Sequence, residues 1–153
     1  ATGMRVSEML HLQIFDVNLQ FGYVVCQENG KERIIPIGIP CKKAMERYLE
    51  RGRTVFVKDD KETALFTNCS GKAMSRQGFW KVLKGYADGA GIKRDIAPHT
   101  LRHSFAVHML QNGADVKSLQ ELMGHEDISA TQAYLAVVKN RIKDVYDKTH
   151  PRA

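Results

Sequence analysis

The chain has 153 residues, a net charge of +6 and an isoelectric point near 9.3. Hydrophobic residues make up 43% and charged residues 26%, which is typical of one globular domain and excludes a disordered or collagen-like chain. No apolar run approaches the ~20 residues of a membrane helix, and no apolar signal segment stands near Ala1, so we expect a cytoplasmic protein. The three cysteines, Cys26, Cys41 and Cys69, are not closely spaced, which favours reduced structural thiols over a zinc site or a disulfide framework.

The positive charge favours a polyanionic partner, most simply nucleic acid. A solvated basic surface without any acidic partner explains the same charge excess equally well. No basic amphipathic helix with a bulky apolar face stands out, so a membrane is not an expected partner. The choice between these interpretations therefore depends on the motifs.

Strand-like segments occur in the first half of the chain. Two β-rich runs cover residues 23–27 and 32–37, and Asn29-Gly30 between them suits the positive φ angles of a type I′ hairpin. Residues 13–18 are a candidate third strand, and residues 63–67 are a candidate short buried strand. These runs predict a small antiparallel sheet near the N-terminus.

Helical patterns surround these strands. One helix is expected over residues 5–12 and another over 40–51, the latter with Ala44, Tyr48 and Leu49 as its inward stripe. From about Ser75 the chain is predicted to be almost wholly helical. Its breaks fall at Gly89-Ala-Gly-Ile, Asn112-Gly113 and Gly124, where helix C-terminal caps are expected. The predicted fold class is α+β, mainly helical, with the small sheet packed against the helices.

A helix that begins through Pro98 carries the first chemical pair. His99 and Arg102 are three residues apart and therefore lie on one side of this helix. A separate stripe, expected to face the core, recurs every four residues at Leu101, Phe105 and Met109. A guanidinium binds phosphate oxygens with two hydrogen bonds, and an imidazole binds or exchanges a proton, so the pair suits a phosphate-handling site.

The next helix is expected to begin at an Asp115 N-cap and to end at Gly124, immediately before His125. Its expected apolar face consists of Val116, Leu119 and Leu122. Ser129 and Gln132 then form a capping box, which places Tyr134 on the second turn of a further helix. A tyrosine nucleophile, with an unperturbed pKa of about 10, needs cationic neighbours that stabilise phenolate.

Four spaced motifs together resemble the tyrosine recombinases, which include the phage integrases and the Xer proteins. They are Arg5 within Ala-Thr-Gly-Met-Arg-Val-Ser-Glu, the His99-Thr-Leu-Arg102 pair, Leu-Met-Gly-His125, and Tyr134 nine positions later. The resemblance runs through nearly the whole chain, and the ending His150-Pro-Arg-Ala153 is especially similar to the Xer branch. It implies that residues 1–153 are the family's catalytic domain, without the N-terminal core-binding domain that clamps the other face of DNA.

The resemblance implies strand cleavage without metal, nucleotide or any other cofactor. Tyr134 would attack a DNA phosphate to give a 3′-phosphotyrosyl enzyme and a free 5′-hydroxyl. Arg5 and Arg102 would clamp the non-bridging oxygens, and His99 and His125 would hydrogen-bond the same phosphate. His99 is also the better candidate for proton exchange with the tyrosine.

One departure from the family pattern concerns the hairpin lysine that protonates the leaving 5′ oxygen. The family usually has Gly-Lys-Gly-x-Lys-Glu-Arg, whereas this chain has Gln27-Glu-Asn-Gly-Lys-Glu-Arg33. With the Lys-Glu-Arg residues matched, Glu28 falls where the catalytic lysine is expected. Lys31, just after the turn, is our hypothesis for the substitute general acid.

Each site residue also has an ordinary structural interpretation. Arg5 suits a surface position or a pair with Glu8, and Tyr134 alone suits a half-buried helix aromatic. His103 and His108 are expected to be packing or surface groups. A zinc site at His99 and His103 lacks the accompanying glutamate or cysteines.

The resemblance implies Xer-type resolution of chromosome dimers on double-stranded DNA carrying a specific site. The implied partners are a related recombinase within a DNA-bound tetramer and a septal DNA translocase. A terminal helix expected over residues 139–149 would pack on the neighbouring subunit. The alternatives are a phage or transposon integrase of the same family, or a DNA-binding module without catalysis.

Overall fold

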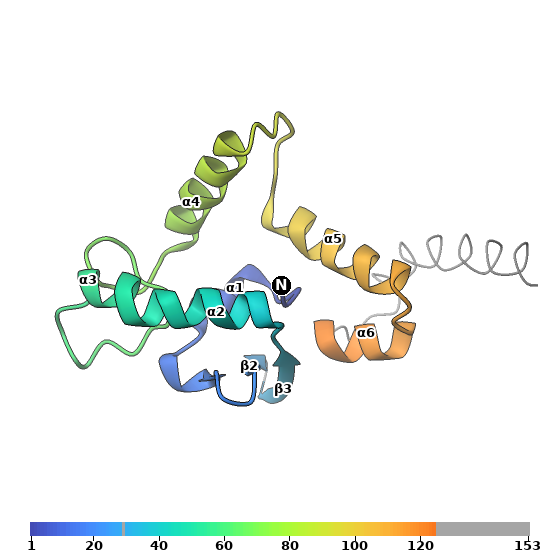
Figure 1. The fold of residues 1–153 in the computed structure, drawn as a ribbon, viewed down its shortest axis with the longest axis horizontal. Helices are drawn as coiled ribbons and strands as arrows, with labels where there is room; N and C mark the ends of the chain where they lie inside the picture. Colours follow the sequence, from blue (N-terminus) through green and yellow to red (C-terminus); the bar gives the residue numbers. More distant parts are fainter. Residues whose placement is uncertain (29, 125–153) are drawn as a thin grey trace, which may run out of the picture.

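The computed structural model describes residues 1–28 and 30–124. Within them the predicted α+β class is confirmed, because most elements are helices and one three-stranded antiparallel sheet lies early in the chain (Figure 1). The elements are α1 (Val6–His11), the 3₁₀ helix η1 (Ile14–Asp16), β1 (Val17–Asn18), β2 (Tyr23–Glu28), β3 (Lys31–Pro36), α2 (Ile39–Arg47), the π-helical η2 (Tyr48–Arg53), α3 (Thr54–Phe56), α4 (Arg76–Gly89), α5 (Pro98–Gln111) and α6 (Val116–Met123). The predicted capping box at Ser129 and the helix over 139–149 lie outside the described residues.

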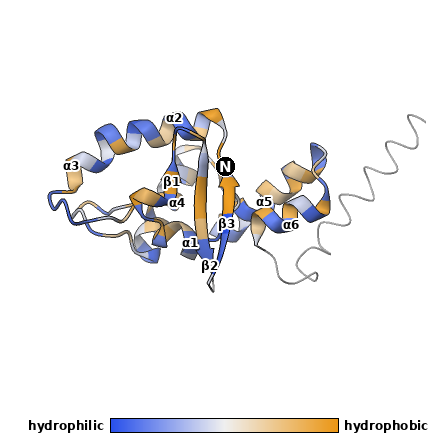
Figure 2. Ribbon diagram, turned by 90° about the horizontal axis from the view of Figure 1, so that it is seen from below, coloured by the Kyte–Doolittle hydropathy of each residue, from blue (hydrophilic) through white to orange (hydrophobic). Residues whose placement is uncertain are grey.

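The sheet has the strand order β1-β2-β3. Strands β2 and β3 pair from Tyr23 with Pro36 to Glu28 with Lys31, which leaves the predicted two-residue connection. Gly30 has a φ of 75°, as this kind of turn requires, and Asn29 lies outside the described residues. The hairpin is hydrophobic where it meets the rest of the molecule and hydrophilic towards its tip (Figure 2).

Two of the predicted strand segments are only partly extended. Strand β1 covers only the end of segment 13–18, because the Asp16 carboxylate accepts a 2.7 Å hydrogen bond from the Gln13 N–H and closes a 3₁₀ turn. Segment 63–67 makes isolated bridges instead of a strand, although it is buried around Leu65 as expected. Local side-chain capping therefore competes with strand pairing in this part of the chain.

The first hydrophobic cluster lies between the sheet and α2. Its buried members are Leu12, Val24, Cys26, Ile35, Ile37 and Leu65. Helix α2 and the following η2 turn cover it with Cys41, Met45 and Leu49, which are four residues apart and share a face. The predicted stripe is therefore wrong at Ala44, which is exposed one position round the helix from Met45.

The second hydrophobic cluster joins α5 to α6. Its buried members are Ala106, Leu110, Leu119 and Met123. The predicted stripe of α5 is wrong at Leu101, which is 48% exposed, because the helix turns Ala106 and Leu110 towards α6. Phe105 and Met109 pack at the edge of this cluster.

Side chains cap the starts of two helices. Asp115 accepts from the Ser118 N–H at the start of α6, as predicted, and the Ser75 side chain accepts from the Gly78 N–H at the start of α4. Gly124 ends α6 with a φ of 64°. Among the helices of the described residues, none is long and apolar enough to span a membrane.

Candidate active site

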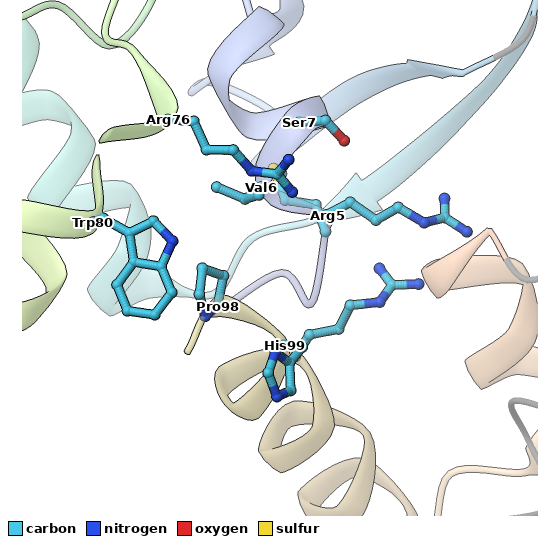
Figure 3. Close-up of a pocket in the computed structure, with 9 residues that line it drawn as sticks. Arg5, Val6, Ser7, Arg76, Trp80, Pro98 and His99 are labelled. Carbon is cyan, nitrogen blue, oxygen red and sulfur yellow. The ribbon is translucent and has the colours of Figure 1, made fainter. Parts of the chain in front are cut away.

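A cavity of about 340 Å³ lies where the N-terminal segment, α4 and the first turns of α5 meet. Three of the predicted site residues, Arg5, His99 and Arg102, line it together. Arg76 and Trp80 line it from α4, and Figure 3 shows these two opposite the side chains of Arg5 and His99. Residues almost a hundred positions apart in the sequence thus meet around one cavity.

Arg5 is the N-cap of α1 and reaches away from it. Its backbone N–H donates to Glu8 Oε2 at 2.5 Å, and its guanidinium forms an ion pair with Glu8 Oε1 at 3.5 Å. Its Nη2 donates to the Gly124 carbonyl at 3.0 Å. The pair with Glu8 that the sequence suggests is therefore present, and it holds a guanidinium that lines the cavity.

Arg102 and His99 come from the first turns of α5. Arg102 donates from Nη1 to the Gly3 carbonyl at 2.5 Å and from Nη2 to the Met123 carbonyl at 2.7 Å. Gly3 has a φ of 65°, and a Cβ there would come within 2.3 Å of the Phe105 ring. Glycine is thus required for the N-terminal segment to lie against α5 and offer its carbonyl to Arg102.

Glu8 is a buried carboxylate behind the cavity, with 6% of its surface exposed. Burial acts to raise the pKa of this carboxyl, but the hydrogen bonds from Arg33 and the Arg5 N–H, with both positive charges, hold it below its usual value. Of the two ion pairs, the one with Arg33 is the closer, since its Nη1 lies 2.5 Å from Glu8 Oε1. Glu8 is therefore ionised and paired on two sides.

The cavity suits an anion. Three of its lining side chains, Arg5, Arg76 and Arg102, carry a positive charge, and no carboxylate is among the residues that line it. His99 adds an exposed imidazole at the start of α5. Guanidinium groups bind phosphate oxygens through paired N–H donors, so this arrangement is able to hold a phosphodiester.

Of the other three predicted site residues, the structure describes Lys31. Lys31 is exposed at the start of β3 and does not line the cavity. His125 and Tyr134 lie outside the described residues. His103 and His108 are exposed on α5, and within residues 1–28 and 30–124 no three His, Cys, Asp or Glu side chains gather in a way that would hold a metal ion.

Sequence reasoning missed three residues of this region. Arg76 and Trp80 line the cavity from α4, and Arg33 forms the ion pair with Glu8 behind it. The spacing of Arg5 and Glu8 does signal their pairing, because position N3 of a helix faces its N-cap. Nothing local signals that Arg33 reaches the same carboxylate across 25 positions.

The phage integrase family model matches residues 1–141 of the chain. The chain belongs to the phage integrase family. Its resemblance to tyrosine recombinases is thereby confirmed. One curated relative, "Tyrosine recombinase XerD" of Oceanobacillus iheyensis, is 51% identical over 155 residues, which cover 100% of this chain and 52% of the relative. The chain thus spans about half the length of the curated relatives it matches.

Solved structures place this phage integrase family member in the same fold. The crystal structure of the XerA recombinase superposes with a TM-score of 0.84 at 30% identity, covering 99% of this chain and 55% of that one. The XerH site-specific recombinase bound to difH substrate, in a pre-cleavage complex, superposes with a TM-score of 0.72 at 30% identity. That match covers 87% of this chain and 39% of the XerH chain.

Proposed function

We propose that residues 1–153 act as the catalytic domain of a Xer-type site-specific tyrosine recombinase, which cleaves and rejoins DNA strands. The observation that carries this proposal is the meeting of Arg5, Arg102 and His99 around one cavity without a carboxylate. Curated relatives named tyrosine recombinase XerD, about 50% identical over the whole chain, support the same assignment.

Arg5 and Arg102 would clamp the two non-bridging oxygens of the scissile phosphate. Each guanidinium already donates to backbone carbonyls, so its orientation is set before DNA binds. Donors that need no reorganisation stabilise the charge that builds on five-coordinate phosphorus. His99, and His125 from outside the described residues, would hydrogen-bond the same phosphate, with His99 as the group that exchanges a proton with Tyr134.

In the covalent step, a phosphodiester bond is exchanged for a phosphotyrosyl bond of similar energy. The phenolic oxygen of Tyr134 forms a bond to phosphorus while the bond from phosphorus to the 5′ oxygen breaks. The phenolic proton passes to a base, for which His99 is the candidate, and the leaving 5′ oxygen receives a proton, for which Lys31 is the candidate. A 5′-hydroxyl from a partner strand reverses these steps, so the proposed reaction needs no nucleotide or metal.

The proposed cellular role is the resolution of chromosome dimers in the cytoplasm. Double-stranded DNA would be the substrate, consistent with the net charge of +6. A related recombinase in a DNA-bound tetramer and a septal DNA translocase are the further proposed partners. Deleting residues after Val138 should remove recombination and leave DNA binding of the isolated protein largely intact, because the terminal segment is proposed to contact a neighbouring subunit.

The deciding experiment mixes the protein with a nicked suicide duplex that carries a Xer-type site. A covalent protein–DNA adduct is expected on a denaturing gel, and the Tyr134→Phe variant should form none. Absence of the adduct, in a preparation that binds the duplex, would contradict the catalytic proposal and favour a DNA-binding module. Adducts that form only on phage or transposon sites would favour an integrase.

A further inference from the structure

Arg33 joins two parts of the molecule through one side chain. It lies on β3, and 14% of its side chain is exposed. Its Nη1 and Nη2 contact Glu8 Oε1 and Oε2 at 2.5 and 2.7 Å, and its Nε donates to the Leu122 carbonyl at 3.0 Å. A guanidinium with two donors on a carboxylate and a third on a carbonyl is held in one orientation.

The contact with Glu8 connects Arg33 to the cavity. The same carboxylate accepts the backbone N–H of Arg5 and pairs with the Arg5 guanidinium. Glu8 is buried, so without Arg33 it would keep only the partly exposed Arg5 as an ion-pair partner among these contacts. Arg33 and Arg5 therefore share one buried carboxylate directly behind the cavity.

The contact with Leu122 connects Arg33 to the end of α6. Three successive carbonyls there accept from three arginines: Leu122 from Arg33, Met123 from Arg102 and Gly124 from Arg5. Carbonyls at a helix C-terminus carry partial negative charge, so cations are favourable at this end. The residue that follows in the sequence is His125.

The Arg33 guanidinium also packs against Gly124, where it leaves no room for a side chain. A Cβ at this position would come within 2.6 Å of Arg33 Nη1, so the guanidinium lies directly against the glycine that ends α6. The two hydrophobic clusters described above share no member, one formed by the sheet with α2 and the other by α5 with α6. Arg33 therefore provides a polar connection between the hairpin and α6.

We propose that Arg33 is a positioning residue for strand cleavage, which holds Glu8 behind Arg5 and fixes the carbonyl end of α6 directly before His125. It does not line the cavity and acts through these neighbours. The inference rests on the proposed recombinase function and adds to it the residue that connects the hairpin strand to the Glu8 partner of Arg5 and to the carbonyl end of α6.

The test compares Arg33→Met and Arg33→Lys with the matched control Arg53→Met. Arg53 also donates to backbone carbonyls, those of Ala64 and Glu62, but it does not line the cavity. Two quantities are measured on the suicide duplex: the single-turnover rate of adduct formation at saturating protein, and the dissociation constant for DNA. The folded fraction of each variant is measured by circular dichroism at the assay temperature.

Arg33→Met is expected to lower the saturated rate about 100-fold, because misplacing a catalytic group by 1 Å can cost about that much. The dissociation constant should change less than about 3-fold, since this cation faces Glu8 rather than phosphate. Arg33→Lys keeps the charge but cannot make all three contacts, so it should restore folding and leave the rate about 10-fold low. Arg53→Met should keep the rate of its folded fraction.

A second readout does not depend on activity. Hydrogen exchange of the backbone amides over residues 119–124 should accelerate in Arg33→Met and stay at the parent level in Arg53→Met. An Arg33→Met protein that cleaves at the parent rate, or a loss that only tracks its unfolded fraction, would overturn the inference, and so would unchanged exchange. A parent protein that binds DNA without forming an adduct would instead overturn the proposed function, and exchange would still test the anchoring of α6.

Discussion

Arg102 and Met123 are joined by a 2.7 Å hydrogen bond from the guanidinium Nη2 to the backbone carbonyl of the last residue of α6. A second bond, from Nη1 to the Gly3 carbonyl at 2.5 Å, ties the same guanidinium to the N-terminal segment. Arg102 thus lies between two parts of the backbone and is oriented before any phosphate arrives. The same side chain adds a positive charge to the cavity and a hydrogen bond to the end of α6.

This double role predicts that Arg102→Lys impairs cleavage more than binding. A lysine keeps one positive charge but cannot donate to both carbonyls and to a phosphate at once. We expect the single-turnover rate of adduct formation to fall about 100-fold or more, the range seen when one oxyanion donor is lost. The dissociation constant for the duplex, measured in parallel, should stay within about 3-fold of the parent because one cation is replaced by another. A rate equal to the parent's would show that two-point donation is not needed.

We predict that Glu8 stabilises the fold at neutral pH and loses this effect as the pH falls. Its pKa is lower in the folded chain, because the arginine contacts outweigh burial, so its contribution is full above its unfolded pKa and is lost as pH falls through the folded pKa. Glu8→Gln should therefore lower the free energy of unfolding by about 3 kcal/mol at neutral pH, since it leaves the largely buried Arg33 side chain without its counter-charge.

Urea unfolding at about pH 7 and about pH 4 measures this difference, which should shrink at the lower pH because the Glu8 carboxyl binds a proton in the unfolded chain before it does in the folded chain. Glu121→Gln, an exposed glutamate on α6, is the control and should change the free energy of unfolding by less than about 0.5 kcal/mol at either pH. A difference between parent and Glu8→Gln that grows towards acid pH would contradict this sign.

Local features of the sequence predict the helices well, and long-range contacts are what it misses. The Pro98 start of α5 and the Gly124 end of α6 are local cap signals, and the three-residue spacing of His99 and Arg102 brings both to one cavity. The contact of Arg33 with Glu8 depends on how β3 docks beside α1, which no local periodicity encodes. The predicted inward faces of α2 and α5 hold at Leu49, Phe105 and Met109 and are wrong at Ala44 and Leu101, because spacing alone does not fix how far a helix is rotated about its axis.

We predict that alanine has opposite effects on stability at Gly124 and at Gly85. The left-handed backbone of Gly124 costs a residue with a Cβ about 1–2 kcal/mol, and the added carbon would also meet Arg33 at 2.6 Å. Gly124→Ala should therefore lower the free energy of unfolding by about 2 kcal/mol and slow adduct formation. Gly85 in α4 has open space around a Cβ, so Gly85→Ala should raise stability by about 0.5–1 kcal/mol. Thermal unfolding of the two variants beside the parent checks both signs.

We predict that replacing Arg76 weakens the salt dependence of DNA binding. Arg76 lines the cavity from α4, whereas Arg51 lies in a separate groove with Glu46 and Glu50. Arg76→Gln should reduce the slope of log affinity against log salt by about 0.9, the value for one phosphate contact. Arg51→Gln should leave the slope near that of the parent. Equal slopes for both variants would place the DNA backbone elsewhere on the molecule.

We predict that Lys31→Ala removes the group that protonates the leaving 5′ oxygen. Lys31 is exposed at the start of β3 and outside the lining of the cavity, so its proposed role requires the hairpin tip to meet the DNA. Lys31→Ala should slow adduct formation about 100-fold, because a general acid typically contributes at least about that factor. A duplex with sulfur in place of the leaving 5′ oxygen needs no proton and should return Lys31→Ala to nearly the parent rate. The same duplex should not rescue Arg102→Ala, whose defect is in stabilising the phosphate charge. A Lys31→Ala protein that cleaves the ordinary duplex at the parent rate would assign the general acid to another group.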